Sequence, residues 1–487
     1  MKKITAMIFA VLMIMSAFTS CGSSGDGSAA SVVSLPVTDD STGEEDMSEI
    51  NDYVDKLAKR YDFSGESFTW IGGGSQAPTE EEDTGDIMSD ALYFRQREIE
   101  EKFNIEWSNY IPPEQADQST HAVVESVKQD VLAGTGVYDA GYGTAVAVCQ
   151  PLFINDCLLD TSEFNVLDLS GEWWTQSLID TYSIGGSVYF LNGAIVTSNY
   201  MDAYGILFSK QTVLDYNIGD LYSYVQNNQW TFDKMFEIAS VIPSNANGSG
   251  AYRYASPNGF AVLFGNGMTV TKYDALSNPY LPEVLPEDLS DLADKFSYYF
   301  GNYSVVAPYA GSEMIAEGGV LFSFETMQSA AEMRKVEDAE FGILPIPKGS
   351  EKQKDYVSYA EPWIAFHVFI PKTTKKLEVT DVIIEVMGAL GVKYIKPTYY
   401  DNILKSRSAY DTQSKEMIDI IFRTKIYDLL DILAMGGGNN GDSKIVSTLK
   451  RAIVRDTEGL ASQYKFEARI VNKNIERILK AIEKDNS

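Results

Sequence analysis

Residues with nucleophilic or metal-binding side chains are few in this chain and lie far apart. Its 487 residues include two histidines, His121 and His367, and three cysteines, of which Cys149 and Cys157 are eight positions apart. No HExxH, CxxC, GxSxG or Walker pattern occurs, and the glycine triplets lack the Lys-Ser/Thr that follows in a phosphate-binding loop. Zinc, serine-triad and phosphate-cradle chemistry therefore have no motif here, and no cofactor is expected.

Side chains that could bind a ligand non-covalently follow several predicted strands. Tyr142 and Thr144 come after the third of these strands. Glu325 directly follows Val320–Phe324, where its carboxylate can accept hydrogen bonds from a pair of hydroxyl groups. Further candidates are Gly73, which would allow close backbone approach, and Tyr200, Asn266 and Trp363. Aromatic and small polar residues also fill cores, so each position has a purely structural alternative.

Apolar runs with strand and helix periodicity alternate along the chain. The strands are expected at 67–71, 105–107, 137–140, 204–208 and 319–324, and the first helices at 92–103 and 123–132, the second ending at Gly134. The β-α-β-α-β order of the first series predicts a parallel, right-handed sheet covered by helices. About 420 residues follow the N-terminal region, which is too many for one core, and the sequence therefore predicts two α/β lobes.

The first 21 residues are typical of an export signal. Lys2 and Lys3 precede an apolar run from Ile4 to Ala17, which is shorter than the about 20 residues of a membrane-spanning helix. Cys21 follows small residues and precedes Gly-Ser-Ser-Gly, which resembles a bacterial lipobox, with Phe18 in place of the usual Leu. The resemblance implies cleavage before Cys21 and its lipidation, which would hold the protein on the outer face of the cell membrane. The alternative is an ordinary signal peptide with a chance cysteine.

The segment after Cys21 is rich in Gly, Ser, Thr, Asp and Glu and has no sustained apolar period. Such a segment cannot bury enough apolar surface to offset its ordering entropy, so we expect a flexible tether. Apolar residues around Ile50 and Val54 predict a short amphipathic helix before the first strand. Export would permit a disulfide between Cys149 and Cys157, and two buried free thiols fit the sequence equally well.

Composition restricts the partners. The chain has 39 Lys+Arg against 69 Asp+Glu, a formal charge of −30, or −32 once Lys2 and Lys3 are removed with the signal. This argues against nucleic acid and anionic lipid surfaces, because phosphate recognition requires a basic footprint. Aromatic residues make up 12% of the chain, including 29 Tyr. Ring faces are suited to a sugar-binding cleft, although most rings fill the core.

Several short motifs occur in order over about 300 residues behind the lipobox. They are Gly134–Ala140 (GTGVYDA), Ile206–Lys210 (ILFSK, where relatives have Asn in place of Ser209), Gln229–Asp233 (QWTFD), and the pair Gly318–Phe322 (GGVLF) and Phe341–Gly349 (FGILPIPKG). Their order and spacing resemble those of extracellular solute-binding proteins of family 1, the maltose-binding type. The resemblance extends from Phe68 to about Leu390. Independently of it, Thr231 can cap a helix in whose positive first turn Asp233 would lie.

This resemblance implies an α/β, two-lobed periplasmic-binding-protein-like fold of type II, with parallel-rich sheets flanked by helices. Crossing strands would join the lobes near 196–205, 359–365 and 397–405. The expected domains are a lipoprotein signal peptide at 1–20, a tether at 21–65, lobe 1 at 66–200 and 360–400, and lobe 2 at 201–359 and 401–487. The ligand would lie in the cleft between the lobes, in contact with Gly73, Tyr142, Thr144, Tyr200, Asn266, Glu325 and Trp363.

The same resemblance implies a non-catalytic, lipid-anchored monomer that captures a carbohydrate, most simply an oligosaccharide, and delivers it to an ABC permease. The sequence does not name the sugar, and peptides, polyols and modified sugars stay open. A surface-anchored polysaccharide-acting enzyme is the alternative from another class, because acidic residues are abundant enough for a glycosidase carboxylate pair. A ligand-sensing subunit of a membrane kinase is a second alternative.

Overall fold

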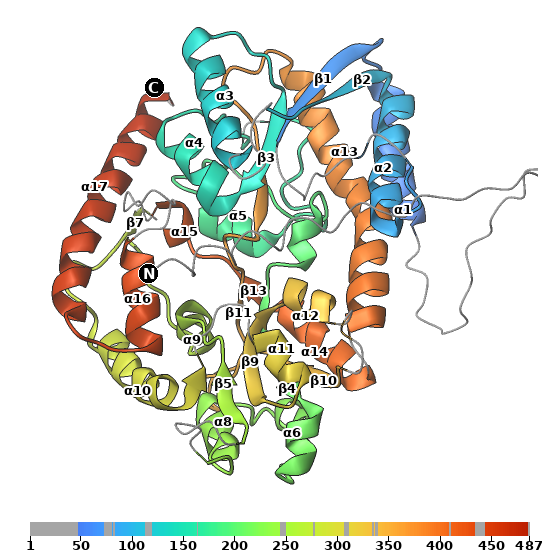
Figure 1. Ribbon diagram of the computed structural model, residues 1–487. Coiled ribbons are helices and arrows are strands. Elements are labelled where there is room, and N and C mark those ends of the chain that lie inside the picture. The colour runs from blue at the N-terminus through green and yellow to red at the C-terminus, as the bar shows by residue number, and fades with distance from the viewer. Residues whose placement is uncertain are drawn as a thin grey trace, which may run out of the picture. The chain divides into compact units, whose positions relative to one another are not determined.

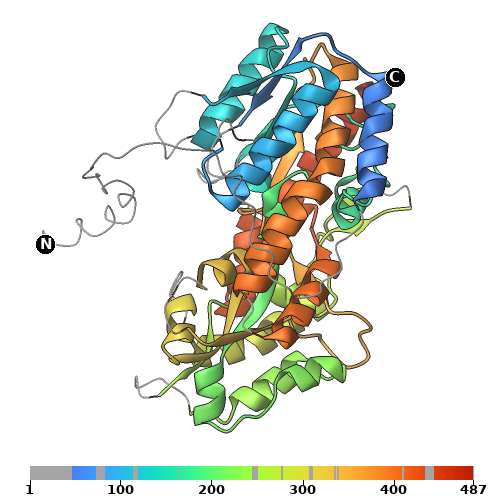
Figure 2. The same ribbon diagram turned by 90° about the vertical axis from the view of Figure 1, so that its right-hand side faces the viewer.

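The computed structural model describes residues 47–485, except for 73–79, 81–82, 113–118, 163, 244–249, 276–277, 306–310, 334–335, 337–338, 409–410 and 434–443 (Figures 1 and 2). Cys21, the predicted signal peptide, most of the predicted tether and Gly73 lie outside the described residues. Of the helices described, none has the length and apolar character needed to cross a bilayer.

The first sheet has four strands in the order β12-β3-β1-β2. They are β1 (Glu66–Ile71), β2 (Ile105–Tyr110), β3 (Ala140–Thr144) and β12 (Phe366–Phe369). β1 runs parallel to β2 and β3, which confirms the parallel sheet predicted for this region, and β12 is antiparallel to β3. β3 begins later than expected because the Asp139 carboxylate, instead of backbone, accepts the hydrogen bond of Thr69 N at 2.8 Å.

Helices cover this sheet and form the first lobe with it. They are α1 (Ser48–Arg60), α2 (Ile87–Phe103), α3 (Ser119–Ala133), α4 (Gln150–Ile154), α5 (Gln176–Tyr182), α13 (Leu377–Ile395) and the π-helical turn η1 (Ala145–Cys149). α1, α2 and α13 pack against one another, while α3 and α4 pack around η1 (Figure 1). α1 is the predicted amphipathic helix, and its Ile50 and Val54 are buried in the core of this lobe. Gly134, with φ +64°, follows α3 as predicted.

The second sheet has five strands in the order β10-β4-β9-β5-β8. They are β4 (Tyr204–Ser209), β5 (Tyr252–Ala255), β8 (Ser304–Val305), β9 (Val320–Thr326) and β10 (Phe341–Leu344). β9, β5 and β8 run parallel, whereas β4 is antiparallel to both β9 and β10. The second lobe is therefore built on a mixed sheet, in which the strand that enters from the first lobe runs against its neighbours.

The second lobe carries its own helices. They are α6 (Lys210–Asp215), α7 (Tyr222–Gln226), α8 (Phe232–Ala239), α9 (Gly259–Gly265), α10 (Glu287–Tyr303), α11 (Gly311–Ala316), α12 (Met327–Met333), α14 (Thr412–Arg423) and α16 (Lys444–Val454). α8 begins as predicted, because Thr231 Oγ1 accepts a hydrogen bond from Lys234 N at 3.2 Å and Asp233 lies in the first turn. The remaining elements are η2 (Thr197–Tyr200), β6 (Lys272–Tyr273), β7 (Pro279–Tyr280), β11 (Ser358–Tyr359), η3 (Lys396–Ser408), β13 (Lys425–Ile426), α15 (Leu430–Leu433) and α17 (Leu460–Asp485).

The chain passes between the two sheets three times before residue 408. η2 leads into β4, and the segment after β11 leads back to β12. The third passage is helical, because α13 continues directly into the π-helical η3, and the predicted crossing strand at 397–405 is wrong. Pro397 has no backbone N–H, so it interrupts the α-helical hydrogen bonding without reversing the chain. β11 pairs in parallel with β13 beside these passages. The lobe boundaries given above stay predictions.

The two described cysteines are free and buried. Cys149 Sγ lies 3.3 Å from Gly143 O, and Cys157 Sγ lies 3.5 Å from Asn155 O, as expected for thiols that donate weak hydrogen bonds. Burial raises the pKa of both thiols. Of the two alternatives left open by the sequence, the structure has the free thiols.

A buried carboxylate joins α1 to α13. Tyr53 OH donates to Glu385 Oε1 at 2.7 Å, and Asp168 N donates to Oε2 at 3.2 Å. The indole N–H groups of Trp173 and Trp174 approach the same Oε2 at 3.4 and 3.3 Å. Despite these donors, burial raises the pKa of Glu385 to about 7. The carboxyl group is therefore partly protonated near neutral pH.

We expect the free energy of unfolding of the Glu385→Gln variant, relative to that of the wild type, to increase as pH rises. The folded-state pKa lies above the value of about 4.3 in an unfolded chain, so the contribution of Glu385 to stability is full below pH 4 and is lost as pH rises through 7. The free energy of unfolding of E385Q, relative to wild type, should increase by about 2 to 3 kcal/mol between pH 5 and pH 8. Urea denaturation at the two pH values measures this difference, and a difference that does not change with pH would contradict it.

Candidate functional site

The two sheets present their carboxyl edges to the same short crossing segment, 360–365. In the first sheet, β3 ends at Thr144 beside the start of β12, and Ala145 N donates to Ala365 O at 2.9 Å. In the second sheet, β9 ends beside the start of β4, and Ala203 forms a β-bridge with Ala360. Six residues therefore connect the two edges. Because ligands of open α/β sheets bind outside the carboxyl ends of strands, this is where a cleft site is expected.

A group of polar side chains lies at this crossing, and we call it the hinge-floor cluster. It consists of Tyr204, Asn258, Glu361 and Lys450. Glu361 Oε2 accepts a hydrogen bond from Tyr204 OH at 2.9 Å and lies 3.5 Å from Asn258 Nδ2 and 3.9 Å from Lys450 Nζ. Its other oxygen, Oε1, is buried and accepts no hydrogen bond from the residues that the structure describes. The cluster thus contains one acceptor whose partner must come from elsewhere.

Local structure places each member of the cluster. Asn258 is the N-cap of α9, since its Oδ1 accepts hydrogen bonds from Phe260 N and Ala261 N, both at 3.0 Å, and this turns its amide nitrogen toward Tyr204 OH at 2.9 Å. A Cβ on Gly259 would lie 2.7 Å from Lys450 Cα, so this glycine lets α16 approach the start of α9 (Figure 1).

Glu325 lies near the end of β9 and outside the cluster, because it pairs with Gly205 whereas Tyr204 pairs with Thr326, so the Glu325 and Tyr204 side chains lie on opposite faces of the sheet. Ser323 Oγ donates to its Oε1 at 2.6 Å. Burial raises the pKa of Glu325 and raises that of Tyr204 well above its ordinary value. A carboxyl group with a raised pKa can serve as acceptor or donor, so these groups suit a ligand rich in hydroxyl groups, which both donate and accept hydrogen bonds.

A buried ion pair lies beside the cluster and joins the crossings. Lys425 Nζ lies 3.0 Å from Asp202 Oδ1 and donates to Asn199 O at 2.7 Å. Tyr427 OH donates to Asp202 Oδ2 at 3.0 Å, and Glu361 N donates to Asp202 O at 2.8 Å. Burial raises the pKa of Asp202 and lowers that of Lys425, while the attraction between the two charges opposes both shifts. The first crossing, the return crossing and β13 are thereby tied together.

The structure places Tyr142 and Thr144 within β3 instead of after the strand, with both side chains buried. The Tyr142 ring lies 6.1 Å from that of Trp70 and 6.0 Å from that of Phe366. A Cβ on Gly72 would lie 1.7 Å from the Tyr142 ring, so only glycine fits there. Thr144 Oγ1 accepts a hydrogen bond from Ala147 N at 3.3 Å and caps η1. These side chains shape the first-lobe edge from within.

The other predicted residues are distributed unevenly around the crossing. Tyr200 is buried, with its ring 5.6 Å from Tyr400 and 6.2 Å from Phe422. Asn266 caps the C-terminus of α9, the opposite end from Asn258. Trp363 lies two residues from Glu361 in the return crossing and is 40% exposed. None of the predicted residues belongs to the hinge-floor cluster; Glu325 lies on the opposite face of the sheet from Tyr204, and Trp363 is two residues from Glu361 in the chain. All stay predictions as ligand contacts.

Sequence reasoning missed Asn258, Glu361 and Lys450. Asn258 follows β5 directly before an apolar segment that begins with Gly259, which is an N-cap signature. Glu361 lies in the same predicted crossing as Trp363, which was a predicted ligand contact. An acidic residue at that place could have been recognised as a second candidate. Lys450 belongs to an ordinary amphipathic helix, and nothing in its neighbourhood in the sequence distinguishes it.

Neither a family model nor a curated protein sequence matches this chain. Solved structures do match. A cyclo/maltodextrin-binding protein complexed with maltotetraose has a TM-score of 0.55 and 12% identity over 86% of this chain and 97% of its own. The galacto-N-biose/lacto-N-biose I-binding protein of an ABC transporter from Bifidobacterium longum, in complex with lacto-N-biose, has a TM-score of 0.54 and 12% identity over 85% and 99%. This chain has the two-lobed fold of these proteins.

A third structure with this two-lobed fold is the maltose-bound MalE3 of T. maritima, with a TM-score of 0.51 and 13% identity over 84% of this chain and 100% of its own. The coverage includes both lobes of each protein, so the predicted fold class, a type II periplasmic-binding-protein-like fold, is confirmed. At 13% identity or less the likeness concerns the fold, and the sugars named here are ligands of those proteins.

We expect Asp202→Asn to destabilise the two-lobed fold by about 3 kcal/mol, because it leaves the buried Lys425 ammonium without a counter-charge. A suitable control is Asp456→Asn, which breaks an exposed ion pair of 2.8 Å with Arg451 and should cost about 0.5 kcal/mol. Urea denaturation of both variants measures the costs. Equal, small losses would show that the buried pair does not hold the crossings together.

Proposed function

We propose that this protein is a non-catalytic, extracytoplasmic solute-binding protein that captures a carbohydrate between its lobes and delivers it to an ABC permease. The observation that carries the proposal is the pair of carboxyl edges that meet at 360–365, next to a polar cluster with an unpaired carboxylate oxygen. Neighbours of the same fold are described as sugar-binding proteins, one of them as part of an ABC transporter, and this supports the choice of ligand class. Lipid attachment through Cys21 is part of the proposal.

The hinge-floor cluster would recognise the ligand through hydroxyl groups. Glu361 Oε1, which has no partner among the described residues, offers an acceptor. Trp363, two residues further along the same crossing, offers an exposed ring on which an apolar pyranose face can stack. A ligand that contacts both lobes stabilises the closed arrangement over the open one, and a permease can then distinguish loaded from empty protein.

A thermal-shift screen tests the proposal, using the chain without its signal peptide and with Cys21→Ser, against oligosaccharides, monosaccharides, polyols and peptides. A ligand at 100 times its dissociation constant adds about 2.7 kcal/mol, which raises the melting temperature by a few degrees. We expect one oligosaccharide class to stabilise the protein and to be recovered unchanged. Consumption of the sugar would instead indicate an enzyme, and stabilisation only by peptides would refute the carbohydrate assignment.

We further expect Trp363→Ala to weaken binding of the stabilising sugar about tenfold, because a stacked ring and its buried area are lost, which amounts to about 1.4 kcal/mol. Tyr298→Ala on α10 is the matched control, since Tyr298 is also an exposed ring, at 57%. Isothermal titration calorimetry of both variants measures the effect. If the two substitutions change the affinity equally little, Trp363 does not touch the ligand.

A further inference from the structure

The C-terminal helix α17 is firmly attached to the second lobe along its first part. It packs on α16, and Arg469 forms an exposed ion pair with Glu283. Asn472 then fixes the helix to the backbone that follows β7, since Leu281 N donates to Asn472 Oδ1 and Asn472 Nδ2 donates to Leu281 O, both at 2.8 Å. These two hydrogen bonds hold the middle of α17 in one position.

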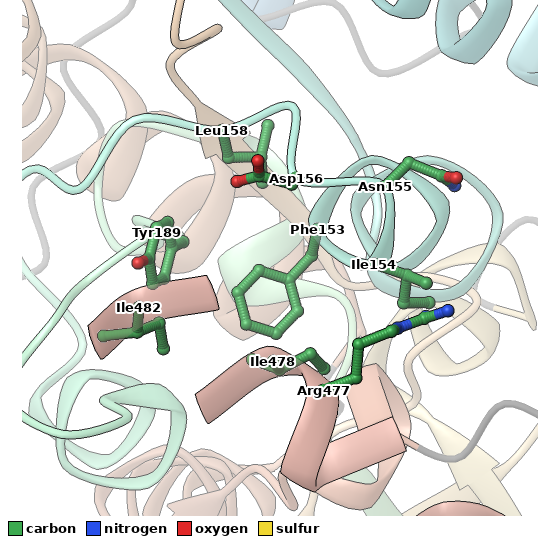
Figure 3. A pocket seen from close by; sticks show the side chains of 9 residues that line it. All are labelled: Phe153, Ile154, Asn155, Asp156, Leu158, Tyr189, Arg477, Ile478 and Ile482. Carbon is green, nitrogen blue, oxygen red and sulfur yellow. The ribbon is translucent and has the colours of Figure 1, made fainter. Parts of the chain in front are cut away.

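Beyond Asn472 the same helix reaches the first lobe. Ile478 and Ile482 of α17 face Phe153, at the end of α4, together with Leu158 and Tyr189 (Figure 3). Figure 3 shows the Phe153 ring between the helix and the loops of the first lobe. Both isoleucines are buried. α17 therefore contacts the second lobe with one half and the first lobe with the other.

The contact with the first lobe is incompletely filled. A pocket of about 220 Å³, open to solvent on one side, lies between the two isoleucines and the side chains that they face. Side chains on opposite walls of such a pocket do not touch across it, so the dispersion contacts of a filled interface are missing there. Separating this contact therefore gives up less interaction than a filled contact of the same extent would. The attachment of α17 is firm at Asn472 and loose at Phe153.

We propose that α17 is a strap between the lobes, which restrains them near the arrangement seen here and releases Phe153 when they move apart. Its purpose rests on the proposed function, since a strap that holds the lobes near the arrangement that binds solute raises the apparent affinity for that solute. α15 packs on α4 and η1 of the first lobe and also contacts α17, so it adds to the attachment of α17 on the side of the first lobe. Only a segment held by both lobes can limit their separation.

Distance measurements between spin labels test the strap without any solute. Leu132 on α3 and Leu214 on α6 are 87% and 70% exposed and report on one lobe each, while Cys149 and Cys157 are buried away from the label. In the mature chain with Cys21→Ser and cysteines at 132 and 214, we expect the double substitution I478A/I482A to lengthen and broaden the distance distribution. Phe466→Ala, at a 64% exposed position of the same helix, is the control and should change nothing.

The same pocket allows a second substitution, which should have the opposite effect on the distance distribution. Ile482→Phe adds side-chain volume where space is present, and it should narrow the distribution. An unchanged or shortened distance in a folded I478A/I482A variant overturns the strap. If that variant does not fold, I482A alone is compared with wild type under the same criterion.

A solute measurement separates the strap from the proposed function. If the screen has identified a sugar, its apparent affinity should fall two- to tenfold in I478A/I482A and remain at the wild-type value in Phe466→Ala. A lengthened distance with no sugar bound by any variant would support the strap and reject the carbohydrate proposal. A bound sugar together with an unchanged distance in I478A/I482A would support the carbohydrate proposal and reject the strap.

Discussion

The arrangement of the two lobes depends on one buried ion pair. Asp202 comes from the first crossing and Lys425 from β13, and removing both charges from water is costly. Two further hydrogen bonds offset this cost: Tyr427 OH donates to Asp202, and Lys425 donates to Asn199 O. They use donors and acceptors of the pair that would otherwise be buried without partners. These groups can be satisfied together in only one register of the crossings. The ion pair thus contributes less to overall stability than to the specificity of the connection.

The candidate site follows from that connection. Because Glu361 N donates to Asp202 O, the return crossing is held at the start of β4, and the Glu361 side chain is directed toward Tyr204 and Asn258. The same crossing continues to the edge of the first sheet. One backbone segment therefore sets both the distance between the sheets and the position of the polar groups between them. Binding and hinge geometry are properties of the same residues.

Local features of the sequence predicted local features of the structure. Hydrophobic periodicity located β1, α2, β2 and α3, and Thr231 predicted the start of α8. The Asp202–Lys425 pair could not be predicted, because its members are 223 positions apart and each reads as a surface charge. Tyr142 shows a different limit, since it was predicted to follow a strand that ends at 140 but lies within β3, where its side chain packs against Trp70 and Phe366. The antiparallel course of β4 is equally a matter of long-range pairing.

The position of α1 has a mechanical consequence. Everything before residue 47 is joined to the molecule through this helix, whose Tyr53 is bonded to Glu385 of α13 and whose Asp55 is paired with Lys102 of α2. A pull on the N-terminal segment is therefore borne by the first lobe alone, and the force does not pass through the crossings. With the attachment proposed through Cys21, the first lobe would be the stationary part under load, and the second lobe could move without working against the attachment.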